Sequence, residues 1–244
     1  MGVARDHEVR VLLLTDSTIF AGTERHMLDL ATGLVQSGIE AMIGCPTCSQ
    51  LADRARSRGL ETIVFDKPSQ IGLGTILLLR KLLLSGRFDL IHVHNGKCAL
   101  QAAIAIRLAG RGQLILTQHF LQTRRVGRSG LRRTVSDVVH QWLRGQIAHY
   151  VAISAAVRVQ MLARGDCPAG SVTTVLNGIT DPRGEGLGSV DEVRCELDLH
   201  RGAPVVMCAS RLEPEKGVAT LIEAMALVIR TVPDAVCIVA GEGR

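Results

Sequence analysis

Short apolar runs rich in β-branched residues alternate with longer helical patterns along most of this chain. Seven runs are typical of strands, at 9–16, 40–45, 61–66, 89–94, 114–119, 149–154 and 172–176. Between them, apolar positions recur at helical spacing over 24–37, 73–84, 98–109, 131–144 and 155–163. Strands that alternate with crossover helices predict an α/β fold with a parallel sheet covered on both faces. Ligands of such sheets bind at the carboxyl ends of the strands.

A polar segment rich in glycine, at 182–190, divides the chain into two parts. We therefore predict a domain over 1–181, a linker over 182–190 and a second unit over 191–244. The second unit shows one strand–helix–strand pattern, at 205–209, 218–230 and 235–240. Two parallel strands and one helix cannot cover their own apolar faces. We expect a truncated domain here, one that self-associates or needs a partner.

Composition narrows the class of protein. The 244 residues are 47% hydrophobic and 21% charged, which is typical of a globular protein with a large core. The net charge of +5 favours anionic partners, but only 2% of the residues are aromatic. Few side chains could therefore stack on bases, so nucleic acid is disfavoured. The apolar runs are too short for a signal peptide or a membrane span, so we expect a cytoplasmic protein.

A basic segment follows the fifth strand pattern. Five cations lie between Arg124 and Arg133. A solvated loop is the simplest interpretation, and an anionic acceptor or an acidic membrane surface is the sharper one. The sequence therefore allows peripheral contact with the inner face of a membrane.

Three positions near strand ends are candidates for cleft chemistry. Gly22 opens a helix after the first strand, which permits either close approach of a ligand to the backbone or an ordinary turn. His92 and His94 alternate at a strand end, so we expect them on opposite faces and unable to bind one metal together. His119 ends the next strand, where it is either structural or part of the cleft.

Two cysteines raise the question of a redox or zinc pair. Cys45 and Cys48 have the C-x-x-C spacing, but no second such pair exists in the sequence. We favour a loop that follows a strand. The glycine fingerprints of dinucleotide and P-loop sites are also absent after the strands.

The turn at 210–217 carries the most specific chemistry. Arg211 and Lys216 lie between an apolar strand and a helical pattern. Two cations beside a helix amino terminus are typical of diphosphate binding. The alternative is a solvated turn in which Glu213 and Glu215 pair with these cations.

Six motifs, in this order, resemble those of the retaining glycosyltransferases of family 4. They lie at 21–24, 89–94, 117–119, 177–179, 211–217 and 241–243. Ala21 stands where that family has glycine, and Thr180 where aspartate is usual. The resemblance implies the GT-B fold, with two facing Rossmann-like domains. Residues 1–181 would be the acceptor-side domain and 191–244 the start of the domain that binds a nucleotide sugar.

The resemblance also implies roles for single residues. Arg211 and Lys216 would bind the donor diphosphate and neutralise the leaving group, so neither a metal nor a cofactor is expected. His119 would be the catalytic residue in contact with the donor sugar. The remaining residues of the donor and acceptor loops would be Gly22, Glu24, His94 and Asn177. A hexose would pass, with retention at the anomeric carbon, to a sugar, lipid or small-molecule acceptor.

One motif of the family is missing. Its Glu-x7-Glu segment, which lies beyond the Gly-x-Gly turn, does not occur here, so we expect a chain with half a donor site and impaired activity. Two alternatives remain open. The chain could be the non-enzymatic acceptor-binding half of a split glycosyltransferase, or a GT-B sugar-nucleotide epimerase.

Overall fold

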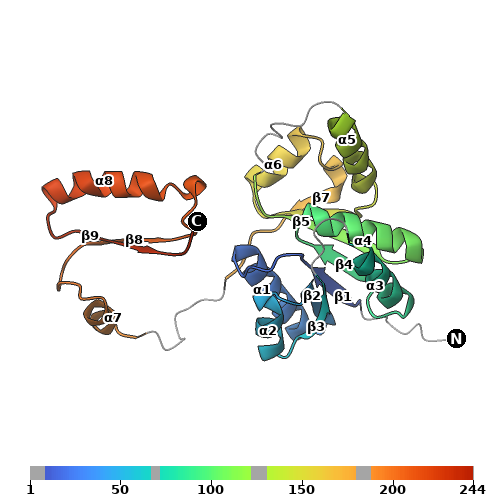
Figure 1. Ribbon diagram of the computed structural model, residues 1–244, viewed down its shortest axis with the longest axis horizontal. Helices are drawn as coiled ribbons and strands as arrows, with labels where there is room; N and C mark the ends of the chain where they lie inside the picture. Colours follow the sequence, from blue (N-terminus) through green and yellow to red (C-terminus); the bar gives the residue numbers. More distant parts are fainter. Residues whose placement is uncertain (1–8, 67–71, 122–130, 180–187, 244) are drawn as a thin grey trace. The chain divides into compact units, whose positions relative to one another are not determined.

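The computed structural model describes residues 9–66, 72–121, 131–179 and 188–243, with the side chains of 131–135 left aside. The chain forms two compact units, Met1–Ile179 and Thr180–Arg244, and each is considered by itself (Figure 1).

A seven-stranded parallel sheet forms the centre of the first unit, in the order β3-β2-β1-β4-β5-β6-β7. This confirms the predicted α/β class and the predicted strands. The strands are β1 (Val11–Leu14), β2 (Ala41–Pro46), β3 (Glu61–Phe65), β4 (Leu90–Val93), β5 (Gln113–Gln118), β6 (His149–Ala152) and β7 (Val172–Thr174). The helices are α1 (Gly22–Gln36), α2 (Gln50–Ser57), α3 (Leu73–Leu84), α4 (Gly96–Ala109), α5 (Leu131–Arg144) and α6 (Ala155–Ala163).

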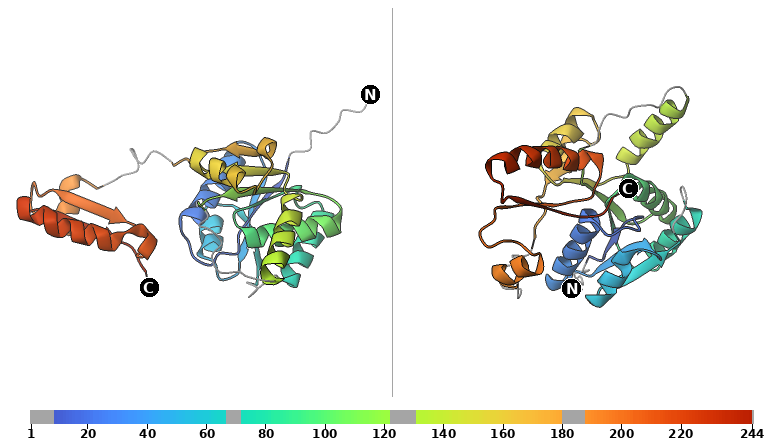
Figure 2. Two further views of the ribbon diagram at one scale, coloured as in Figure 1. Left: turned by 90° about the horizontal axis from the view of Figure 1, so that it is seen from above. Right: turned by 60° about the vertical axis from the view of Figure 1, so that its left-hand side comes forward.

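Strand β1 shows why helices cover both faces of this sheet. Its four residues are apolar and buried, and they alternate between two cores. Leu12 and Leu14 pack with residues of α3, α4 and α6, whereas Leu13 packs with residues of α1 and α2. Period-two alternation in a strand with no polar position requires an apolar layer on each side. Figures 1 and 2 show the helices arranged in this way around the sheet.

Helix α2 was not predicted, because most of its residues are polar. Ser49 caps it by accepting a hydrogen bond from the Leu51 N–H at 3.3 Å, and Leu51 is fully buried. The loop expected after β2 is confirmed, because Cys45 is a buried residue of that strand and Cys48 lies in the turn that follows. Burial raises the pKa of the Cys45 thiol to about 11. A redox pair needs the opposite shift, so this motif is structural.

The second unit contains α7 (Val190–Glu196), a parallel pair of strands and a longer helix. These are β8 (Val205–Ala209), β9 (Val236–Ala240) and α8 (Val218–Thr231), as the sequence predicts. Apolar side chains that a sheet or helix normally covers are exposed in this unit: Met207 is 65% exposed and Leu227 is 62% exposed. Among the described residues, no helix is both long and apolar enough to cross a membrane.

Candidate histidine and diphosphate sites

The strand order places one site at the carboxyl ends of β1, β4 and β5. Strand β1 pairs with β2 on one side and with β4 on the other. The strand order therefore runs outward in opposite directions from β1 and β4, which is a topological switch point. The segments that follow β1 and β4 lead directly into α1 and α4. Loops at such a reversal diverge and leave room for a ligand between them.

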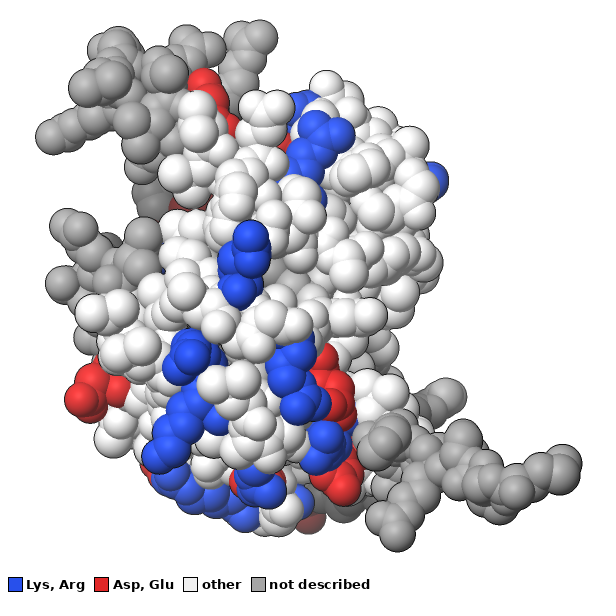
Figure 3. Space-filling view, turned by 90° about the vertical axis from the view of Figure 1, so that its right-hand side faces the viewer, with Lys and Arg blue, Asp and Glu red and all other residues white. Residues whose placement is uncertain are grey.

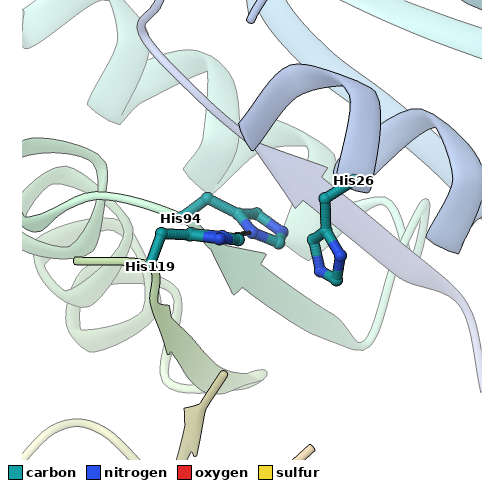
Figure 4. Close-up of side chains that lie close together, drawn as sticks. All are labelled: His26, His94 and His119. Carbon is teal, nitrogen blue, oxygen red and sulfur yellow. Dashed lines mark hydrogen bonds between the residues drawn. The ribbon is translucent and has the colours of Figure 1, made fainter. Parts of the chain in front are cut away.

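Three histidines meet at this edge of the sheet. His26 belongs to α1, His94 follows β4 and His119 follows β5 (Figure 4). The His94 Nδ1 and His119 Nε2 atoms lie 2.9 Å apart and share a hydrogen bond. The His26 ring centre lies 5.1 Å from that of His119 and 5.7 Å from that of His94, both edge-on. The three imidazoles therefore form one contiguous polar cluster, which we call the histidine cluster.

The expected separation of His92 and His94 is wrong. Their rings stack with centres 4.6 Å apart. Strand β4 ends at Val93, so His94 lies outside the pleat and strict alternation no longer fixes its direction. The His92 Nε2 atom meets the Thr117 hydroxyl at 2.7 Å, which holds its ring against the neighbouring strand.

Burial sets the charge of these rings. Desolvation, with a smaller contribution from neighbouring histidines, lowers the pKa of His92 and His119 to about 4 each. Desolvation also lowers the pKa of His26, and it lowers the pKa of His94 well below its ordinary value. A cation is costly where water is excluded, and neighbouring imidazolium rings would repel one another. The cluster is therefore neutral at pH 7 and offers both donors and acceptors.

The start of α1 is organised by Glu24. Its carboxylate is buried and accepts a hydrogen bond from the Ala21 N–H at 3.0 Å. This contact satisfies a backbone donor that the helix itself leaves free. The Arg54 guanidinium lies 4.1 Å from the centre of the Phe20 ring and holds the residue before Ala21. Glu24, predicted as a loop residue of the site, shapes that loop from within.

Gly22 lies in open space. A Cβ atom added there would meet no other atom of the described chain within 4 Å, and the backbone is not left-handed. Packing within the protein therefore gives no reason for glycine. The interpretation as a place of close ligand approach remains a prediction.

A second polar group lies at the ends of β1 and β4, and sequence reasoning missed it. Asn95 donates to an Asp16 oxygen at 3.0 Å and caps α4 by accepting from the Cys98 N–H at 2.8 Å. The Lys97 ammonium lies 3.5 Å from the other Asp16 oxygen. His26 was also missed. Its position one turn after Gly22, in the helix that follows β1, is the signal that could have found it.

Asn177 does not lie next to the histidine cluster in the order of the strands. It is exposed and follows β7, the edge strand, which two other strands separate from β4.

The second unit carries the predicted cations on the turn between β8 and α8. The Arg211 guanidinium donates to Glu215 at 3.0 Å, and its other nitrogen lies 4.0 Å from Glu213. Lys216 is exposed and has no ion pair among the described residues. Gly217 adopts the left-handed conformation, with φ 65°, and begins α8 without a side-chain cap. The amide groups of that helix end are therefore available to an anion.

The basic segment from Arg124 to Arg133 lies outside the residues whose side chains are described. Elsewhere on the first unit, Lys and Arg gather over part of the face shown in Figure 3. Helices α3 and α4 each end with an exposed cation, Lys81 and Arg107.

Comparison with known proteins identifies a family and a fold. The family model described as Glycosyltransferase Family 4 matches residues 20–183. A phosphatidyl-myo-inositol mannosyltransferase of Mycobacterium tuberculosis is 26% identical over 176 residues, which are 71% of this chain and 42% of that protein. The chain thus spans less than half the length of this curated relative.

Solved structures share the fold at low identity. Anabaena HepE in complex with UDP and glucose superimposes with a TM-score of 0.75 at 22% identity, over 97% of this chain and 62% of that one. A structure titled putative UDP-N-acetylglucosamine 2-epimerase, from Listeria monocytogenes, gives 0.56 at 14% identity, over 95% and 62%. The fold is that of the GT-B glycosyltransferases, as the sequence resemblance implied.

The Glu24 contact leads to a prediction about stability. Glu24→Ala removes the acceptor for the Ala21 N–H and should lower the free energy of unfolding by about 0.5–2 kcal/mol, the usual range for a lost cap. Glu24→Gln keeps an oxygen in place and should cost less. Urea unfolding followed by circular dichroism measures both. Equal stability of Glu24→Ala and the parent would show that the contact does not organise α1.

Proposed function

Because this chain belongs to glycosyltransferase family 4, we propose that it serves the transfer of a hexose from a nucleotide-diphosphate sugar to an acceptor, with retention at the anomeric carbon. The observation that carries the proposal is the convergence of His26, His94 and His119 at the carboxyl ends of β4 and β5, beside the start of α1. Neutral imidazoles can donate hydrogen bonds to sugar hydroxyls and accept them. They do not have to stabilise the negative charge of the leaving diphosphate.

The first unit supplies the groups for the sugar and the acceptor in this proposal. His119 contacts the donor sugar, and His94 holds His119 through the 2.9 Å hydrogen bond. Gly22 lets the α1 loop approach the ligand closely. Asn177 and Glu24 belong to the surrounding loops.

The second unit supplies the groups for the diphosphate. Negative charge grows on the leaving diphosphate as the glycosidic bond breaks, and fixed cations stabilise that charge. Arg211 and Lys216 provide two of them, and the uncapped amino terminus of α8 adds backbone donors. No step of this chemistry requires a metal or a cofactor.

The acceptor is a sugar, a lipid or a small molecule. The mannosyltransferase relative is named for phosphatidyl-myo-inositol, which supports a lipid acceptor. The cations between Arg124 and Arg133, together with the basic face of Figure 3, support peripheral contact with an acidic membrane.

Two other functions compete with this one. As the non-enzymatic acceptor-binding half of a split transferase, the chain would bind acceptor but turn over no donor by itself. As a sugar-nucleotide epimerase, it would consume a nucleotide sugar in the absence of any acceptor. The epimerase fold match is the weaker one, with a TM-score of 0.56 against 0.75.

A transfer assay tests the proposal directly. UDP-, GDP- and ADP-hexoses are offered with vesicles that contain phosphatidylinositol and with a panel of soluble saccharides, and released nucleotide and product are both measured. We expect acceptor-dependent release and an anomer of unchanged configuration by NMR. His119→Ala should lower the rate by about tenfold or more, because a hydrogen bond to the reacting sugar is lost. Acceptor-independent consumption of donor would favour the epimerase, and donor binding without turnover by the parent would contradict an active transferase.

The diphosphate assignment predicts a loss of affinity. Arg211→Ala and Lys216→Ala should each weaken binding of UDP, GDP or ADP by roughly 1.5–3 kcal/mol, the range for hydrogen bonds to charged groups. Arg201→Ala is the matched control, because Arg201 is an exposed cation elsewhere in the same unit. Titration calorimetry measures all three. If both test variants bind as tightly as the control, the turn does not hold the diphosphate.

Gly22 and Gly33 form a matched pair within α1, since at neither would an added Cβ atom lie within 4 Å of described atoms beyond its chain neighbours and its own helix backbone, and neither is left-handed. Gly22→Val should weaken binding of a nucleotide sugar by about tenfold, or about 1.4 kcal/mol, because its side chain fills space that the ligand needs. Gly33→Val should leave binding unchanged. Thermal unfolding of both variants checks that the fold is intact. Equal affinities would return Gly22 to an ordinary turn.

A further inference from the structure

The histidine cluster has a second capacity, which depends on its nitrogen atoms. One ring nitrogen from each of His26, His94 and His119 lies within 4.8 Å of those of the other two. The three residues come from three separate segments, α1 and the ends of β4 and β5. Figure 4 shows the rings gathered together, with His26 opposite the His94–His119 pair.

His94 leaves one polar atom unsatisfied. Its side chain is 5% exposed, and its Nε2 atom is buried without a hydrogen-bond partner. Its Nδ1 atom is already used by His119. In either neutral tautomer, the Nε2 atom is a donor or an acceptor that lacks a partner, which is costly where water is excluded. In the tautomer with the proton on Nε2, the Nδ1 atom that faces His119 carries the lone pair that a cation needs.

We propose that His26, His94 and His119 form a binding site for a single late first-row divalent cation, of which Zn²⁺ is the reference. Imidazole nitrogen is a ligand that Zn²⁺, Co²⁺ and Ni²⁺ share, whereas Mg²⁺ and Ca²⁺ take oxygen. Three protein ligands leave a fourth position open to water or to a hydroxyl group.

The distances suit such an ion after small movements. Ligand nitrogens lie about 2.0–2.1 Å from zinc, so two of them at the tetrahedral angle are about 3.3 Å apart. The His94–His119 pair, at 2.9 Å, needs to open by only a few tenths of an ångström. The His26 nitrogen must move toward the other two nitrogens. Rotation of the side chain can achieve this without movement of α1, because His26 is only partly buried.

The site overlaps the proposed contact with the donor sugar, since both use His119. An ion in the cluster would therefore compete with donor and inhibit transfer. This consequence rests on the proposed function, whereas ion binding itself does not. Separate experiments therefore measure ion binding and inhibition of transfer.

Titration of the untagged full chain with Co²⁺ and Zn²⁺, after treatment with a chelator, tests the site. We expect one ion per chain, with a visible Co²⁺ spectrum of nitrogen ligands and no thiolate charge-transfer band, because the three ligands are all histidines. His26→Gln should weaken ion binding at least about a hundredfold, because it removes a ligand. Loss of a residue that only hydrogen-bonds to a metal ligand already lowers metal affinity by about 10–100-fold. His119→Asn should do the same if His26→Gln is poorly folded. His200→Gln is the control, because His200 is an exposed histidine of the second unit.

Several outcomes would overturn the site. They are the absence of stoichiometric binding, a Co²⁺ spectrum of thiolate ligands, and unchanged affinity in a folded His26→Gln variant. The transfer assay, run with chelator present, is independent of these results. Transfer without ion binding removes only the metal site, and ion binding without transfer or donor binding removes only the proposed function.

Discussion

The pairing of β1 with strands on both of its sides is the constraint on which the first unit depends. Its leucines are buried in two separate cores, so helices must cover both faces of the sheet. Right-handed crossovers then carry the chain away from β1 in opposite directions. The segments after β1 and β4 separate at this point, and the polar residues of the site occupy the edge that they leave. The site therefore follows from the apolar pattern of a strand that contributes no reactive group.

Burial gives the histidine cluster its chemistry. His94 and His119 are buried and His26 is partly buried, which keeps the rings neutral, and the His94 Nε2 atom has no hydrogen-bond partner. A neutral, crowded group of imidazoles suits the hydroxyls of a sugar, and the same group suits a soft cation. The proposed sugar contact and the proposed metal site would therefore both depend on the same packing.

The sequence predicted the strands better than the positions of side chains at their ends. Seven strands and the α/β class follow from apolar periodicity, since a buried strand needs an uninterrupted apolar run. Helix α2 was not predicted, because its amino-terminal cap and three buried residues stabilise it, whereas its composition is mostly polar. The stacking of His92 on His94 was not predicted, because side chains alternate between the two faces only within a strand, and β4 ends between these residues. The position of His26 beside His94 and His119 depends on tertiary distances, which spacing along the chain does not contain.

The turn at Arg211 shows the ion pairing that the sequence allowed, and the diphosphate contact stays a proposal. Arg211 pairs with Glu215, yet both side chains are largely exposed, and such surface pairs are weak because water screens them. A diphosphate offers more negative charge than one carboxylate, and in the proposed function it would engage Arg211, Lys216 and the α8 amides at once. It would then displace Glu215 from Arg211, because an exposed ion pair is a weak contact. The observed pair is therefore compatible with the proposed diphosphate site.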